Sequence, residues 1–240
     1  AQGPQDAPSA RNGATSYPSS AGPAEYQDLV ELFREWREYQ SPEMVDGVPD
    51  YTADAMERQY DALSQWRERL TAIDTTGWSV SHKVDWYLVW AEMNGLEFAH
   101  RVKRPWARDP GFYVWFYPDP TDIPEREGPT IHGAIELPNY DRPLSDSDAS
   151  EIARRLRNAP ELFEQARENL RDSNARDLWV TGARSMRSQA ESLTRFAESV
   201  SDDHRDLATA AREAASSSGN VASWLADRSW SKTRPSGVGR

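Results

Sequence analysis

Three arginines surround a tryptophan within residues 92–113, where the chain reads EMNGLEFAHRVKRPWARDPGFY. Guanidinium groups beside an aromatic wall can bind a carboxylate or another anion, because arginine donates paired hydrogen bonds in a fixed plane. The alternative is structural: the arginines bind helix-end carbonyls and loop acids such as Asp109 while the tryptophan packs. The candidate substrate-binding residues are Arg101, Arg104, Trp106, Arg108 and Tyr113.

The other reactive residues do not complete a catalytic set. No histidine has the HExxH spacing that places two imidazoles on one helix face; the four are His82, His100, His132 and His204. Glu92 and Glu97 are five positions apart and therefore lie on different faces of a helix. The sequence has no GxSxG elbow and no Gly-rich phosphate loop. We therefore predict no catalytic residue and no metal ligand in this chain.

The composition limits the class of protein. The 240 residues suffice for one large or two small domains, and ten Trp, nine Tyr and six Phe predict an aromatic-rich core. A net charge of −11 argues against nucleic acid as a partner, since phosphate binding needs clustered Lys and Arg. The absence of cysteine excludes disulfides and thiolate metal sites. No apolar run is long enough to span a membrane.

Hydrophobic periodicity predicts an all-α fold, a multi-helix bundle. Helices are expected over residues 26–40, 53–74, 81–102, 147–159, 160–172, 174–199, 202–217 and 221–229, with Thr52 as an N-cap and Gly219 as a break. The helix at 81–102 is apolar on two faces, which predicts a central position in the bundle. Gly95 in its interior predicts that a neighbouring backbone packs closely there.

The predicted domain covers residues 25–235, with a long Pro- and aromatic-rich loop inserted at 105–149. Eight of the sixteen prolines lie in this loop, which has room for a short helix or one β-ribbon. The segment DGVPDY at residues 46–51 is interpreted as a structured turn or, alternatively, as the rim of a cleft.

Both ends of the chain have a different composition. Residues 1–24 are rich in Ala, Gly, Pro and Ser, which predicts a disordered tail like those that follow a cleaved signal peptide. The Gly-rich residues 236–240 are expected to connect to a missing C-terminal part.

Several strings carry a family resemblance, in order from residue 26 to residue 240: LFREWREYQ, DGVPDYTADAM, RLTAIDTTGW, VDWYLVWAEMNGLEFAHRVKRPWARDPGFY, APELFEQARENL and SGVGR. They resemble the N-terminal half of the bacterial domain-of-unknown-function 885 proteins. That resemblance implies an exported (periplasmic, lipoprotein or secreted), largely helical bacterial protein of about twice this length. It also implies a C-terminal half with an HExxH zinc site like that of the gluzincin metallopeptidases, with zinc as cofactor and peptides as substrates. This chain ends before that motif would arrive, so no zinc ligand is carried over.

The leading hypothesis is that the chain is the N-terminal helical part of a zinc-metallopeptidase-like protein. It would form a wall of the substrate cleft, bind the C-terminal catalytic half and not be catalytic alone. The alternative is a self-contained, non-catalytic helical binding module that uses the 105–149 loop to hold a partner or glycan. A third reading is an assembly subunit without enzymatic activity. The first hypothesis predicts an exposed apolar interface, whereas the second predicts a monodisperse chain with no large apolar patch.

Overall fold

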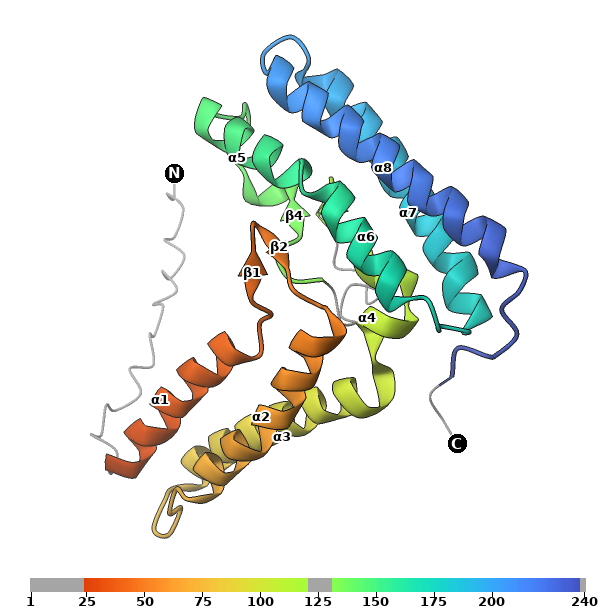
Figure 1. The fold of residues 1–240 in the computed structure, drawn as a ribbon. Helices are drawn as coiled ribbons and strands as arrows, with labels where there is room; N and C mark the ends of the chain where they lie inside the picture. Colours follow the sequence, from red (N-terminus) through yellow and green to blue (C-terminus); the bar gives the residue numbers. More distant parts are fainter. Residues whose placement is uncertain (1–23, 121–130, 238–240) are drawn as a thin grey trace, which may run out of the picture.

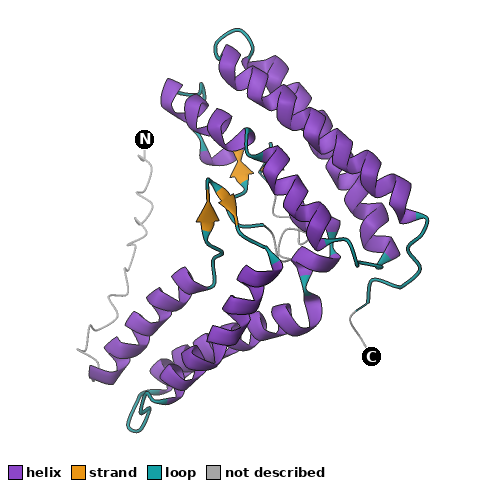
Figure 2. Ribbon diagram, viewed as in Figure 1, coloured by secondary structure: helices purple, strands orange, loops and turns teal. Residues whose placement is uncertain are grey.

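The computed structural model describes residues 24–120 and 131–237, and it confirms the all-α fold class (Figures 1 and 2). The long helices are α1 (Ala24–Tyr39), α2 (Ala53–Thr71), α3 (Val80–Phe98), α5 (Asp146–Leu156), α6 (Ala159–Asn169), α7 (Arg176–Val200) and α8 (Arg205–Ser229). The short elements are β1 (Met44–Val45), β2 (Val48–Pro49), the π-helix η1 (Ala99–Lys103), α4 (Pro105–Arg108), the 3-10 helices η2 (Pro110–Tyr113) and η4 (Leu137–Asn139), β3 (Phe116–Tyr117) and β4 (Ile135–Glu136). The predicted tail lies outside the described residues, apart from Ala24, and so do the last three residues of the predicted connector.

Two separate clusters of buried apolar side chains hold the chain together. The small core joins α1, α2 and α3 through Leu29, Leu32, Trp36, Leu63, Leu70, Trp78, Val89 and Met93. The large core extends from Val48 in β2 to Leu225 in α8 and fills the space between α4 to α8 and the short strands. In Figure 1, α1 to α3 occupy one end of the molecule, and α5 to α8 occupy the other.

Helix α2 belongs to both cores. Met56 near its start is buried in the large core, whereas Leu63 and Leu70 are buried in the small core. Its start is fixed as the sequence predicts, because the Thr52 hydroxyl oxygen accepts a hydrogen bond from the Ala55 amide. The two ends of one continuous helix therefore connect the two parts of the molecule.

The pair α7 and α8 forms the main wall of the large core, and the two long helices lie side by side (Figure 1). The buried face of α8 is made mostly of small residues: Ala208, Ala210, Ala211, Ala214, Ala215, Ser218 and Ala222. Small side chains let two helix backbones approach closely. The predicted break at Gly219 is wrong, because α8 is continuous through it. Packing along α7 outweighs the roughly 1 kcal/mol that one interior glycine costs a helix.

The prediction that α3 is central is also wrong. Its buried residues are Val89 and Met93, and the opposite side is open to solvent. We call the apolar residues of that side the α3 stripe: Val80, Val84, Tyr87, Leu88 and Phe98, which are 81, 49, 63, 60 and 40% exposed. Gly95 does not mark a close backbone contact, because a Cβ built there meets no atom of the described residues within 4 Å. Periodicity shows that this face is apolar, but it does not show what covers it.

The sequence predicts either a short helix or a β-ribbon in the 105–149 loop, and the structure has both helical turns and a short strand pair there. The loop holds α4, two 3-10 helices and a short parallel pair in which Phe116 of β3 faces Ile135 of β4. Residues 121–130 of this loop lie outside the described residues. The DGVPDY segment is a turn, as predicted: Asp46 and Gly47 have φ of 50° and 86° and close the antiparallel β1–β2 hairpin. Across the described ranges, no helix combines the length and hydropathy that crossing a membrane requires.

Candidate functional site

The Arg/Trp segment forms a sharp corner at the end of α3. The helix first widens into the π-helix η1, and Arg104 then adopts a left-handed conformation with φ 44° and ψ 56°. Pro105 follows and starts α4; a residue before proline is disfavoured in the right-handed helical region. Both a π-helical turn and a left-handed non-glycine residue cost free energy, and both are often found at functional sites.

Trp106 and Tyr113 lie inside the corner and connect α4 to α6. Trp106 is buried, and Tyr113 is fully buried. The Tyr113 hydroxyl donates to the Trp106 carbonyl at 2.7 Å and accepts from Asn169 Nδ2 at 2.8 Å. Burial raises the pKa of Tyr113, so the phenol stays protonated. These two residues position the corner, and their predicted contact with a substrate stays a prediction.

The three arginines of the corner have different partners. Arg101 lies 4.0 Å from Glu97, one turn back along the helix, and is largely exposed. Arg108 donates to the carbonyls of Lys103 at 3.3 Å and Ser236 at 3.1 Å, so it braces the corner against the C-terminal segment. This is the carbonyl-binding role that the structural interpretation predicts. The carboxylate of Asp109, however, accepts a hydrogen bond from the Gly111 amide.

Arg104 differs from the other two arginines because it has no partner among the described residues. Its side chain is exposed and makes no hydrogen bond or ion pair within the described part of the chain. It borders two clefts that share Ala107, Asn169 and Asp172. One cleft, of about 770 Å³, lies between α2, α4 and α6; the other, of about 600 Å³, lies between α4 and the segment Arg234–Gly237.

The larger cleft is acidic except at Arg104. Its carboxylates are Glu57, Glu161, Glu164, Glu168 and Asp172. An acidic wall attracts cationic groups, while a single guanidinium at its end can pair with an anion. The cleft therefore carries negative charge along its wall and one positive charge at its end.

His100 is a buried residue of this corner that the sequence reasoning did not assign. Its Nε2 lies 2.7 Å from Gln59 Oε1 in α2, and its ring lies 4.8 Å from that of Trp106. The Gln59 amide nitrogen donates to the carbonyls of Tyr39 and Gln40, so its oxygen is free to accept from His100. Burial lowers the pKa of His100 to about 4, which keeps the imidazole neutral at neutral pH.

The other histidines lie in separate places. His82 stacks on Tyr26, His132 borders a pocket beside the β1–β2 hairpin, and His204 approaches the Leu144 carbonyl. Within residues 24–120 and 131–237, no three His, Asp or Glu side chains are grouped so that they could hold a metal ion.

Comparison with known proteins gives one match. A family model described as "Bacterial protein of unknown function (DUF885)" matches residues 37–234, which is most of the chain. Neither the curated proteins nor the solved structures include a match to this chain.

Proposed function

This chain belongs to the DUF885 family of bacterial proteins, and from that premise we propose that it is the N-terminal helical part of an exported zinc-metallopeptidase-like protein. In this proposal it forms a wall of the substrate cleft, binds the C-terminal catalytic half of the same protein and carries no catalytic group itself. The zinc cofactor, the peptide substrates and the export in this proposal rest on the family resemblance of the sequence strings given above.

The exposed α3 stripe is the observation that carries this proposal. It runs from Val80 to Phe98, roughly 27 Å along the helix axis. Charged side chains do not interrupt the stripe itself, and Tyr87 and Leu88 at its centre are both at least 60% exposed. Soluble monomers rarely expose apolar patches of more than a few hundred Å², and larger ones mark interfaces. A self-contained module that binds its partner through the 105–149 loop does not account for this surface, whereas a wall that docks on a second half does.

The larger cleft at the Arg/Trp corner supports a role in peptide binding. Glu164 and Glu168 already pair with Arg167 and Arg171. The other carboxylates of the cleft can pair with basic side chains or an N-terminal ammonium group, and Arg104 can pair with a carboxylate. The Arg104 side chain makes no ion pair with the described residues, so it is available to a ligand without first breaking one.

The docking surface can be tested on the 240-residue chain. We expect the chain to self-associate and to bind ANS, with both signals reduced in Val84→Glu because a charge in the stripe opposes apolar contact. Val180→Glu is the matched control, since Val180 is 40% exposed on α7 and lies outside the stripe. Light scattering and ANS fluorescence measure the two effects. A monomeric wild-type chain without ANS binding would support the self-contained module instead.

The enzymatic part of the proposal must be tested on the complete parent protein. Zinc-dependent peptidase activity should require the C-terminal half, and Arg104→Ala should raise KM for peptides with a free carboxylate at unchanged kcat. Arg108→Ala is the comparison, because its bonds to Lys103 and Ser236 predict a lower Tm with unchanged kinetics. A tight zinc site with peptidase activity in the 240-residue chain alone would contradict the proposal.

A further inference from the structure

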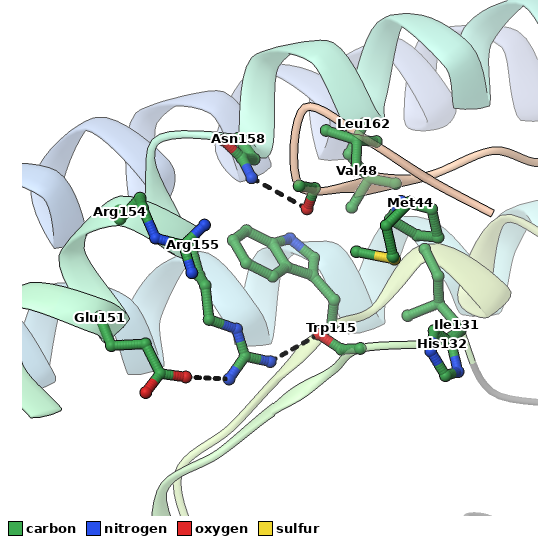
Figure 3. A pocket seen from close by; sticks show the side chains of 13 residues that line it. Met44, Val48, Trp115, Ile131, His132, Glu151, Arg154, Arg155, Asn158 and Leu162 are labelled. Carbon is green, nitrogen blue, oxygen red and sulfur yellow. Dashed lines mark hydrogen bonds and ion pairs between the residues drawn. The ribbon is translucent and has the colours of Figure 1, made fainter. Parts of the chain in front are cut away.

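A separate pocket lies between the β1–β2 hairpin, helix α5 and residues 131–133 (Figure 3). Its volume is about 360 Å³, at the small end of the range for ligand pockets. It shares no lining residue with the two clefts at the Arg/Trp corner. Its function is therefore a separate question from that of the corner.

The indole of Trp115 supplies a buried donor without an acceptor. Trp115 is 5% exposed, and its Nε1–H makes no hydrogen bond to the described residues. Its backbone, in contrast, is fully paired: the amide donates to Gln189 Oε1 at 2.8 Å, and the carbonyl accepts from Ile135 at 2.7 Å. Figure 3 shows the ring in the middle of the pocket, with the nitrogen on the side of Val48 and Asn158. Buried tryptophans usually find an acceptor, because an unpaired buried donor is unfavourable.

The pocket is positively charged, although the chain carries a net charge of −11. Two arginines and one glutamate contribute the charged groups of its lining. Arg155 is occupied: it pairs with Glu151 and donates to the Tyr140 hydroxyl and to the carbonyls of Gly133 and Ala134. Arg154, which is exposed and whose guanidinium lies beside the Trp115 ring in Figure 3, makes no ion pair or hydrogen bond with the described residues. The positive charge of Arg154 is thus available to a ligand.

Gly47 makes room for these donors. Its φ of 86° is a conformation that side chains disfavour, and a Cβ there would lie 2.6 Å from Asn158 Nδ2 and 3.5 Å from an Arg154 terminal nitrogen. The Asn158 amide nitrogen also donates to the Gly47 carbonyl at 2.9 Å, which holds the hairpin turn against α5. Apart from His132 and Gly133, the rest of the lining is apolar: Met44, Val48, Pro49, Ile131 and Leu162.

We propose that this pocket binds a small monoanionic carboxylate that carries an apolar group. The Arg154 guanidinium pairs with the carboxylate, and a small displacement of the side chains that cover the Trp115 Nε1–H lets it donate to an acceptor oxygen of the ligand. The apolar group contacts the wall formed by Val48, Ile131 and Leu162. A carboxylate fits better than a phosphate monoester, because one unpaired guanidinium balances a single charge, whereas a phosphate carries about −1.5 to −2 at neutral pH.

This ligand chemistry has two sources, a free carboxylic acid and the C-terminus of a peptide. Calorimetric titration of the 240-residue chain with N-acetyl-leucine and N-acetyl-leucinamide tests the carboxylate. A hexapeptide ending in leucine, with a free or an amidated C-terminus, tests the peptide source. We expect millimolar or tighter binding of the acids and at least about tenfold weaker binding of the matching amides, since hydrogen bonds to charged groups are the strong ones. Whichever acid binds more tightly identifies the source.

Variants connect the binding to the named residues. Arg154→Gln should weaken binding of the acid at least about tenfold, whereas Arg184→Gln, a change at an exposed arginine of α7 outside the pocket, should leave it unchanged. In NMR spectra the indole N–H resonance that Trp115→Phe removes should shift downfield when the acid is added, as expected for a new hydrogen bond. The proposal is overturned if neither acid binds at several millimolar, if acid and amide bind equally, or if Arg154→Gln binds like the wild type. None of these outcomes depends on the zinc-peptidase proposal, whose tests use the α3 stripe and the complete parent.

Discussion

The sequences of α3 and α8 suggest that α3 is the more deeply buried helix, but the structure shows the reverse. Helix α3 contains Val, Leu, Tyr and three other aromatic residues, yet its buried side chains are Val89 and Met93. Helix α8 consists largely of Ala and Ser on its inner side, yet eleven of its residues are buried. Ala208, Ala211, Ala215, Ser218 and Ala222 follow one another at spacings of three and four, which keeps them on one face against α7.

The difference teaches that burial follows from the available partner and not from the hydrophobicity of the segment. Small residues at regular spacing allow α7 and α8 to pack closely along their whole length, so α8 needs few large apolar side chains. In α3 the large apolar side chains extend past the small core into solvent. Apolar residues in excess of the local core therefore stay exposed where no other described element covers them.

Leucine truncation in each core gives the largest expected effect. Leu70 in the small core and Leu156 in the large core are both fully buried, and each change to alanine should cost about 2–5 kcal/mol of unfolding free energy. We expect Leu70→Ala to reduce hydrogen-exchange protection in α1 and α3 while α7 and α8 stay protected, and Leu156→Ala to reduce it in the large core. Equal loss of protection throughout both variants would show that the two cores unfold as one unit.

Acid should weaken the junction between the two cores by a smaller amount. The pKa of His100 is about 4 in the folded protein and about 6.5 when unfolded, so the unfolded chain binds the extra proton between these values. The free energy of unfolding therefore keeps its full value, as far as His100 is concerned, above about pH 6.5. It should fall by about 2–3 kcal/mol as the pH is lowered toward 4. Urea unfolding at pH 7 and pH 4.5 measures this change. His100→Gln should remove most of it, and His82→Gln at the other end of α3 should not.

A pair of glycine substitutions should give the smallest effects, with opposite signs. A Cβ at Gly182 in α7 would lie 2.6 Å from Pro110 Cβ and 3.0 Å from the Gly111 amide, so Gly182→Ala should destabilise by about 1–3 kcal/mol. Gly95→Ala in α3 meets open space and should stabilise by about 0.5–1 kcal/mol through helix propensity. Denaturant titrations compare the two. A destabilising Gly95→Ala would mean that the α3 stripe is covered in solution.

Much of the fold could be predicted from the sequence, because helix periodicity, the Thr52 cap and the Asp-Gly turn are local properties. The burial of α3 and the continuity of α8 could not, since both depend on what lies beside each helix. The Arg/Trp corner was located correctly as a helix end, but the separate partners of Arg101, Arg104 and Arg108 depend on contacts with distant segments.

The pocket around Trp115 was missed for the same reason. Its residues come from four stretches of chain, and the acceptor that holds the Trp115 amide is Gln189, seventy-four positions later. Gln189 lies among mostly apolar residues at helical spacing in α7, and this pattern was a signal in the sequence. Its oxygen also accepts from Phe116, and its nitrogen donates to Ser218.

Because of the π-helix at Ala99–Lys103, the direction in which the corner residues point depends on the number of residues in this turn. A π-helical turn accommodates one residue more than an α-helical turn, so a single deletion there would allow α3 to continue as a regular helix. Each residue of an α-helix turns the chain by about 100°, and the deletion would rotate all that follows by that angle. Trp106 would lose its place against α6, and Arg104 would no longer lie between the two clefts. Among relatives of this chain, an insertion or deletion at this point would mark proteins whose corner faces a different direction.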